Sequence, residues 1–130
     1  MVCVDTSFLV ALIRRDPNAE NLLENYVTSE TRLTTTPITV CELFKGAYKS
    51  NRDENIRKVR KILTYLQVSE FSVHACETYG RLVNELRLKG SPIGDLDAMI
   101  ASIALASGEP LLTSDKKHFE RVPGLVVRTW

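Results

Sequence analysis

One stretch of the chain, PIGDLDAMIASIAL at residues 92–105, restricts the fold more than any other. After Asp97 it is almost wholly apolar, and its Ala, Ile, Leu and Met residues would occupy nearly every face of a helix. A helix that is apolar all round belongs in the interior of a protein. The sequence therefore predicts a central buried helix from Asp95 to Ser107, ended by Gly108, with two carboxylates at its entrance.

Short apolar or β-branched runs alternate with helical patterns along the rest of the chain. Strands are expected at residues 2–4, 32–35, 68–73, 110–113 and 125–128. A helix capped by Thr6 or Ser7 is expected to carry Phe8 to Ile13, and further helices are expected at residues 18–27, 39–48, 53–66 and 75–88. The pair Thr39 and Glu42 has the spacing of a capping box. We predict an α/β fold, a three-layer α/β/α sandwich with a central parallel sheet of four to five strands.

Composition and length fit one domain spanning residues 1–130. The chain is 44% hydrophobic and 25% charged, close to the average for soluble proteins. No apolar stretch is long enough for a membrane span, and the N-terminus lacks the basic region of a signal peptide, so we expect a cytoplasmic location. The three widely spaced cysteines, Cys3, Cys41 and Cys76, form no zinc or disulfide pattern and are expected to be buried thiols.

Carboxylates stand where predicted strands end or helices begin. Asp5 and Asp115 each follow a strand, Glu42 lies near the start of a helix, and Asp95 and Asp97 open the buried helix. The carboxyl ends of parallel strands and the starts of the following helices face the same edge of a sheet, where ligands bind. Each residue alone also fits a helix cap, a favourable charge at a helix start or a turn. Together they predict one acidic pocket.

Clustered carboxylates repel one another, and a divalent cation removes that cost. Oxygen ligands without a His or Cys set suit Mg²⁺ or Mn²⁺, as one or two ions, rather than zinc. Such ions can activate water for cleavage of a phosphodiester. The sequence thus predicts metal-dependent hydrolysis.

Four ordered motifs resemble those of the PIN-domain family, most closely its VapC-type toxins: VDTSFLVAL (4–12), TVCELFKGA (39–47), PIGDLDAMIASIAL (92–105) and LLTSDKKHFERVPGL (111–125). By this resemblance the metal-binding acidic quartet is Asp5, Glu42, Asp97 and Asp115. Asp95 matches a position that is often acidic in the family and is a secondary candidate. Thr6 and Thr113 match polar positions near the metal.

The resemblance implies a metal-dependent endoribonuclease, the toxin of a toxin–antitoxin pair. It also implies a homodimer and a small antitoxin whose C-terminal segment crosses the active-site groove, often with an Arg that pairs with the acids. An apolar face around Leu43, Phe44 and helix 53–66 is a candidate for such contacts. Cleavage by water would leave a 5′-phosphate. His74 and His118 are expected outside the chemistry, His118 on an exposed turn before Phe119.

RNA binding is expected to depend on local basic clusters, because the formal net charge is only +1. The pair Lys45 and Lys49 shares roughly one helix face with Glu42, and Lys116 and Lys117 directly follow Asp115. We take these four lysines as the candidate rim of the acidic pocket. The basic run at residues 57–61 is the next candidate.

Two other classes of protein remain open from the sequence. A PIN-like binding module without activity would keep the fold, although retention of all four acidic positions argues against it. A phosphoacceptor or phosphatase domain also uses aspartates at strand ends. Receivers have an acidic pair after the first strand, and phosphatases have a second Asp two residues after the first, whereas this chain has Asp5-Thr6-Ser7.

Overall fold

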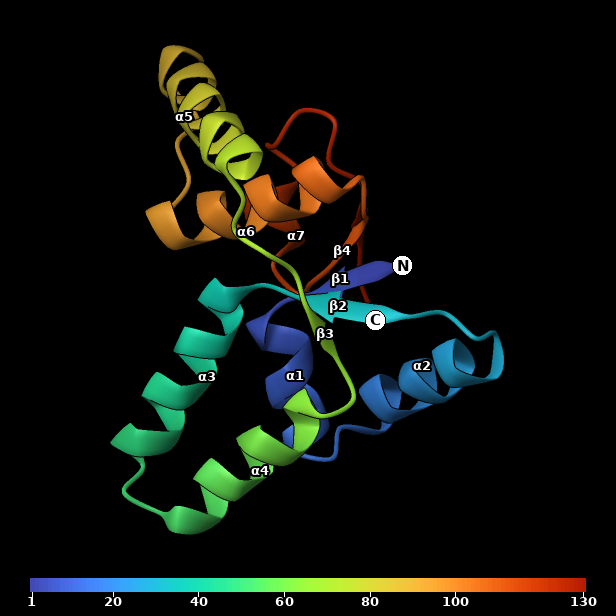
Figure 1. The fold of residues 1–130 in the computed structure, drawn as a ribbon. Helices are drawn as coiled ribbons and strands as arrows, with labels where there is room; N and C mark the ends of the chain where they lie inside the picture. The colour runs from blue at the N-terminus through green and yellow to red at the C-terminus, as the bar shows by residue number, and fades with distance from the viewer.

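A computed structural model describes all residues, 1–130, and contains a five-stranded, wholly parallel sheet (Figure 1). The strands are β1 (Val2–Val4), β2 (Leu33–Thr35), β3 (Gln67–Val68), β4 (Leu111–Leu112) and β5 (Val127–Arg128). Their order in the sheet is β3-β2-β1-β4-β5, and every neighbouring pair is parallel. The predicted α/β class and strand number are confirmed.

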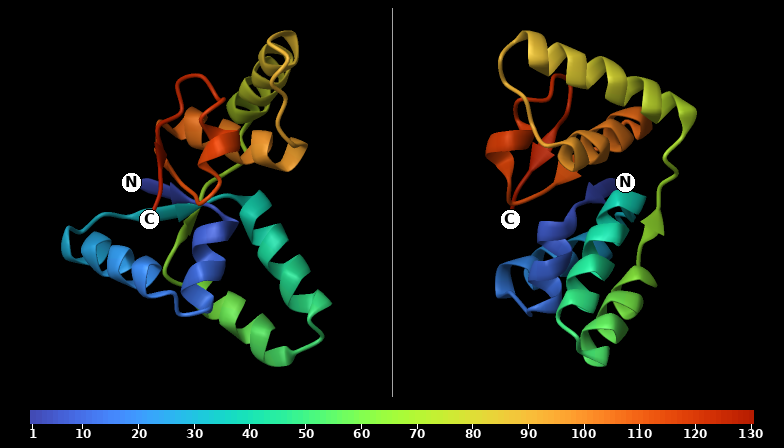
Figure 2. Two further views of the ribbon diagram at one scale, coloured as in Figure 1. Left: turned by 180° about the vertical axis from the view of Figure 1, so that it is seen from behind. Right: turned by 90° about the vertical axis from the view of Figure 1, so that its left-hand side faces the viewer.

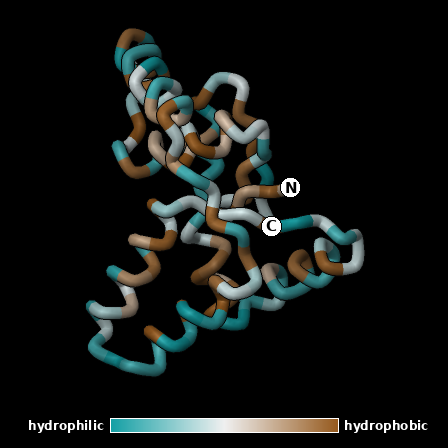
Figure 3. Tube along the Cα trace, in the orientation of Figure 1, coloured by the Kyte–Doolittle hydropathy of each residue, from teal (hydrophilic) through white to brown (hydrophobic).

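Helices cover both faces of the sheet (Figures 1 and 2). One side carries α1 (Thr6–Ile13), α2 (Pro17–Thr28), α3 (Pro37–Lys49) and α4 (Asp53–Leu63). The other carries α5 (Val73–Leu88), α6 (Asp95–Ser107) and the short α7 (Lys116–Phe119). Brown and teal segments alternate along the helices, and the turn between α3 and α4 is teal (Figure 3).

Strand β1 connects the two cores because successive side chains on a strand point to opposite faces. Val2 and Val4 join the cluster that includes Phe8 and Leu9 of α1. Cys3, between them, joins the cluster formed with Ile100 of α6 and other residues of α5, α6 and α7. The register of β1 with β4 pairs Cys3 with Leu111 and Val4 with Leu112. Burial raises the pKa of the Cys3 thiol to about 12, so this thiol stays protonated at neutral pH.

Helix α6 is the buried helix that the sequence predicts. Its buried residues are Ala98, Ile100, Ala101, Ser102, Ile103 and Ala104. It ends at Gly108, whose φ of 68° is the left-handed conformation that glycine adopts without strain. Its first turn carries Asp95 and Asp97.

Several sequence predictions about element ends are wrong, among them the strands expected at 110–113 and 125–128, which are only Leu111–Leu112 and Val127–Arg128. The strand expected at 68–73 is only Gln67–Val68. Helix α5 begins at Val73 rather than Ala75, because Ser72 caps it by accepting a hydrogen bond from the Ala75 N–H at 3.1 Å. The helix expected at 53–66 ends at Leu63. The capping box is also wrong, since Thr36 caps α3 by accepting from the Thr39 N–H at 3.0 Å and Pro37 occupies the first helical position.

Two predictions about exposure need correction as well. Cys41 and Cys76 are exposed rather than buried, because each lies off the helix face that packs on the sheet. Leu43, proposed for partner contacts, is only 4% exposed and belongs to the core. No helix in the structure combines the length and apolar character that crossing a bilayer would require.

We predict that Leu86→Ala destabilises the protein by about 2–5 kcal/mol, because it leaves a cavity in the core beneath α5. Leu86 is 1% exposed, whereas Leu88, two residues later on the same helix, is 71% exposed. The matched control Leu88→Ala should change stability by no more than about 0.5 kcal/mol. Urea unfolding measures both values. Equal losses for the two variants would contradict the placement of this helix.

Candidate metal centre at the carboxyl edge of the sheet

Asp5 is a buried carboxylate directly after β1, only 6% exposed. Its Oδ1 caps α1 by accepting from the Ser7 N–H at 3.0 Å and the Phe8 N–H at 3.3 Å, and it accepts from the Ser7 hydroxyl at 2.5 Å. Its Oδ2 accepts from the Thr113 hydroxyl alone. Burial raises the pKa of Asp5, although the hydrogen bonds from Ser7, Thr113 and Phe8 oppose that shift. Oδ2 therefore keeps a free lone pair for a ligand.

Glu42 enters the site from the second turn of α3, which follows β2. The Thr6 hydroxyl donates to its Oε1 at 2.8 Å, and this bond joins α1 to α3. The other oxygen, Oε2, has no hydrogen bond within the protein. Thr6 thus orients the carboxylate of Glu42.

Asp97, in the first turn of α6, is the carboxylate on which the other charges act. Burial raises its pKa, and so do the negative charges of Asp115, Glu42 and Asp5, in that order. His118 lowers the pKa of Asp97 by a smaller amount than burial, Asp115 or Glu42 raises it. All four predicted acids therefore lie close enough to interact. Their mutual repulsion means that a positive charge placed among them would be stabilised.

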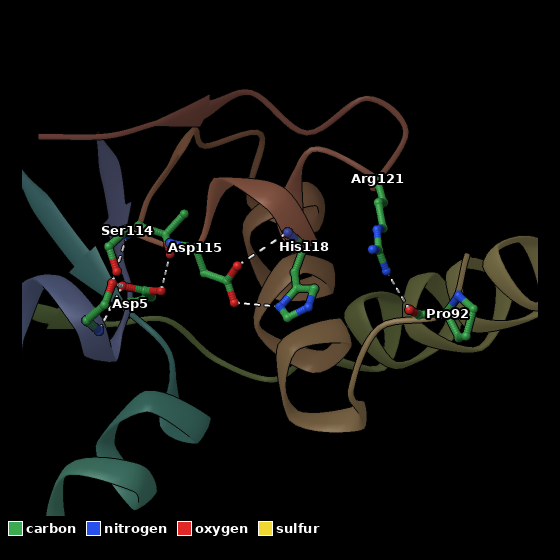
Figure 4. Close-up of polar contacts among 8 residues, drawn as sticks. Asp5, Pro92, Ser114, Asp115, His118 and Arg121 are labelled. Atoms are coloured by element: carbon green, nitrogen blue, oxygen red, sulfur yellow. Dashed lines mark hydrogen bonds and ion pairs between the residues drawn. The ribbon is translucent and has the colours of Figure 1, made fainter. Parts of the chain in front are cut away.

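Asp115 follows β4 and caps α7 (Figure 4). Its Oδ1 accepts from the His118 N–H at 3.3 Å, and its Oδ2 lies 2.6 Å from Nδ1 of the His118 ring. Its own N–H donates to the Thr113 hydroxyl at 2.9 Å, so Thr113 connects Asp115 to Asp5. Ligand atoms of Asp97, Asp115 and His118 lie within 4.8 Å of one another, a spacing that one metal ion can bridge.

Asp95 and the four candidate lysines have exposed side chains. Asp95 is exposed and accepts a hydrogen bond at 3.3 Å from the Tyr79 hydroxyl of α5. This contact directs Asp95 toward α5, and Asp95 is not among the acids whose charges raise the pKa of Asp97. All four candidate lysines have exposed side chains, Lys45 and Lys49 on α3 and Lys116 and Lys117 on α7.

Two residues of the site were missed in the sequence. Ser7 donates to Asp5 and accepts from the Ser114 N–H at 2.9 Å, which ties α1 to the loop after β4 (Figure 4). Its position two residues after Asp5 is typical of a local turn bond, and that much was visible in the sequence. His118 lies on α7 with its ring against Asp115, so its expected place on a turn outside the site is wrong.

Comparisons with known proteins identify the family of the chain. The PIN domain family matches residues 2–125. Ribonuclease VapC2 of Rickettsia felis is 35% identical over 129 residues, which is 98% of this chain and 96% of that protein. The tRNA(fMet)-specific endonuclease VapC of Salmonella typhimurium is 32% identical over 128 residues, with the same two coverages.

Solved structures extend the likeness to three dimensions. VapBC2 from Rickettsia felis, bound to a DNA fragment from the promoter, superposes with a TM-score of 0.93 at 32% identity, covering 100% of this chain and 99% of the other. VapBC-1 from nontypeable Haemophilus influenzae gives a TM-score of 0.88 at 30% identity, with coverages of 100% and 98%. The resemblance seen in the four motifs is thereby confirmed. The chain belongs to the PIN-domain family and is similar to its VapC-type members over nearly its whole length.

Proposed function

We propose that residues 1–130 form one PIN domain that acts as a VapC-type endoribonuclease, the cytoplasmic toxin of a VapBC-type pair. The observation that carries the proposal is the convergence of Asp5, Glu42, Asp97 and Asp115 at one sheet edge, with burial and mutual repulsion raising the pKa of Asp97. Relatives that align with nearly all of the chain are named as a ribonuclease and an endonuclease.

The four carboxylates fit a divalent cation. Their charges raise one another's free energy in a partly buried site, and a cation would relieve this. Asp5, Asp97 and Asp115 would hold one or two Mg²⁺ or Mn²⁺ ions, with Glu42 as a further ligand or as the group that orients water, because these ions prefer oxygen ligands. A bound ion would supply Lewis acidity, which lowers the pKa of water and neutralises charge on a phosphate.

The chain's own residues orient the reacting groups. Thr6 holds Oε1 of Glu42 and leaves Oε2 free to accept a hydrogen bond from water. Thr113 and Ser7 fix Asp5 at the floor of the site. Attack by water on the phosphorus, with departure of the 3′ oxygen of the preceding nucleotide, leaves a 5′-phosphate on one product. The exposed lysines of α3 and α7 would contact phosphates at the rim.

A partner site is supported by a separate feature, an apolar groove of about 820 Å³. Its walls come from α1, α2, α4 and the segment leading into β3, and they include Leu12, Leu23, Ile62 and Leu66. Arg15, Arg32, Lys58 and Lys61 line it as well, together with one acid, Glu20, which pairs with Arg15 at 2.8 Å, so the lining carries an excess of positive charge. Several similar structures are VapBC complexes. We therefore assign this groove to a small antitoxin segment with apolar and acidic side chains, and we expect the toxin itself to be a homodimer.

We predict that removal of divalent ions abolishes RNA cleavage and that Mg²⁺ or Mn²⁺ restores it. Denaturing gels of end-labelled RNA, with and without chelator, measure the activity. Products should carry a 5′-phosphate and no 2′,3′-cyclic phosphate. An inactive binding module would bind RNA without cleaving it under any metal condition. A phosphoacceptor or phosphatase would instead react with a small phosphate donor or a phosphomonoester.

We predict that Asp97→Asn abolishes metal binding and cleavage while the metal-free fold keeps or gains thermal stability. The raised pKa means that folded protein with ionised Asp97 is penalised relative to the unfolded chain at neutral pH. This loss of stability is complete when the pH is above the pKa of Asp97 in the folded protein. It decreases as the pH falls below that pKa, and it vanishes below the lower pKa of Asp97 in the unfolded chain. The advantage of the Asn variant over the parent should therefore shrink on acidification. Thermal melts in chelator at several pH values test this, and a large loss of stability would mean that Asp97 has a structural role.

We predict that the double variants Lys45→Ala/Lys49→Ala and Lys116→Ala/Lys117→Ala weaken binding to many RNAs alike. Each lost phosphate contact should flatten the dependence of log affinity on log salt by about 0.7. Affinity is measured across a salt series in an Asp97→Asn background or with Ca²⁺. If both double variants keep the slope of their background, the RNA path lies elsewhere, and the basic run at residues 57–61 becomes the candidate.

A further inference from the structure

His118 brings the only imidazole to the proposed metal site, and the acidic quartet does not account for it. His118 is the third residue of the short helix α7, and its side chain is 47% exposed. The other histidine of the chain, His74, lies on α5 and lines a small cavity between α5 and α6. The question is what His118 does beside Asp115.

His118 contacts both oxygens of one carboxylate. Its backbone N–H donates to Oδ1 of Asp115 at 3.3 Å, and its ring Nδ1 lies 2.6 Å from Oδ2 (Figure 4). A carboxylate in its ionised form only accepts hydrogen bonds, so the imidazole tautomer that fits this contact is the one with its proton on Nδ1, which would donate to Oδ2. Two donors from a single residue hold the Asp115 side chain in one orientation. Each carboxylate oxygen keeps a further lone pair, and ligand atoms of Asp115 and Asp97 lie within 4.8 Å.

Direct ligation of metal by Nδ1 fits this geometry poorly. Adjacent ligand atoms on an octahedral ion with bonds of about 2.1 Å stand roughly 3 Å apart. The 2.6 Å between Nδ1 and Oδ2 is instead the distance of a charge-assisted hydrogen bond. Resting on the function proposed above, we propose that His118 is a positioning residue whose Nδ1–H holds Asp115 toward Asp97 for metal binding. Groups that orient a ligand in this way commonly change metal affinity by about 10–100-fold.

Helix α7 is anchored without the imidazole. Phe119 and Val122 are 1% and 3% exposed and belong to the core on this face of the sheet. Arg121 donates from Nη1 to the Pro92 carbonyl at 3.1 Å, which ties the turn after α7 to the loop that leads into α6 (Figure 4). Loss of the His118 ring should therefore remove the contact to Oδ2 of Asp115, keep the backbone donor to Oδ1, and leave the backbone of α7 in place.

Three variants separate the roles. His118→Ala removes the Nδ1 donor. His118→Asn replaces it, because the amide nitrogen of asparagine is attached at the same number of bonds from the backbone as Nδ1. His74→Ala controls for the loss of a histidine that binds metal adventitiously. Mn²⁺ affinity of the full chain is measured by titration calorimetry, with a thermal melt of each metal-free variant and an RNA cleavage assay of the parent.

We expect His118→Ala to weaken Mn²⁺ binding by about 10-fold or more. His118→Asn and His74→Ala should stay within about 3-fold of the parent, because each keeps a donor to Asp115. Unchanged Mn²⁺ affinity in His118→Ala would overturn the inference. An equal loss of affinity in His118→Asn and His118→Ala would also overturn it, because it would show that the imidazole binds the metal directly. A melting temperature that falls with the affinity in His118→Ala alone would indicate a structural role and would also overturn it. If the parent binds Mn²⁺ and cleaves RNA, these outcomes leave the proposed function standing; a parent that does neither overturns both.

Discussion

The buried carboxylate of Asp5 is the contact on which the arrangement of this edge of the sheet depends. It accepts hydrogen bonds from the start of α1 through one oxygen and from Thr113, after β4, through the other. Because β1 lies between β2 and β4, these bonds join neighbouring elements that are distant in the chain. A charged group with such burial is stable only with partners, and Asp5 has four hydrogen bonds within the protein.

Structural and chemical roles coincide in two of the four acids but separate in the others. Asp5 and Asp115 cap helices, so their carboxylates would be favourable there even without a metal. Asp97 accepts no capping bond, and the start of α6 has no side-chain cap. Glu42 is held only by Thr6. The repulsion among the four carboxylates therefore destabilises mainly the ionised form of Asp97, the residue whose pKa the other acids raise. A cation is the simplest way to reverse that cost.

Much of this could be predicted because the relevant patterns are local or follow from parallel topology. The all-round apolar pattern of α6 required burial, and alternating strands and helices required a parallel sheet with helices on both faces. Once the sheet is parallel, residues after β1 and β4 must meet at one edge. Element ends were less predictable: Thr36 and Ser72 each started a helix earlier than the apolar periodicity indicated, because a cap depends on one hydrogen bond rather than on a repeated pattern.

The supporting hydrogen bonds of the site lay beyond sequence reasoning for two different reasons. Thr113 to Asp5 and Ser114 to Ser7 join residues 108 and 107 positions apart, and no local rule pairs them. His118 and Asp115 are only three residues apart, so the sequence alone could have suggested that they are neighbours on a helix. It was missed because the direction of its ring depends on α7, a four-residue helix whose start is set by Asp115 itself. The carboxylate of Asp115 thus caps α7, and this helix places the His118 ring beside the same carboxylate. A sequence comparison that records acids alone would overlook this partner.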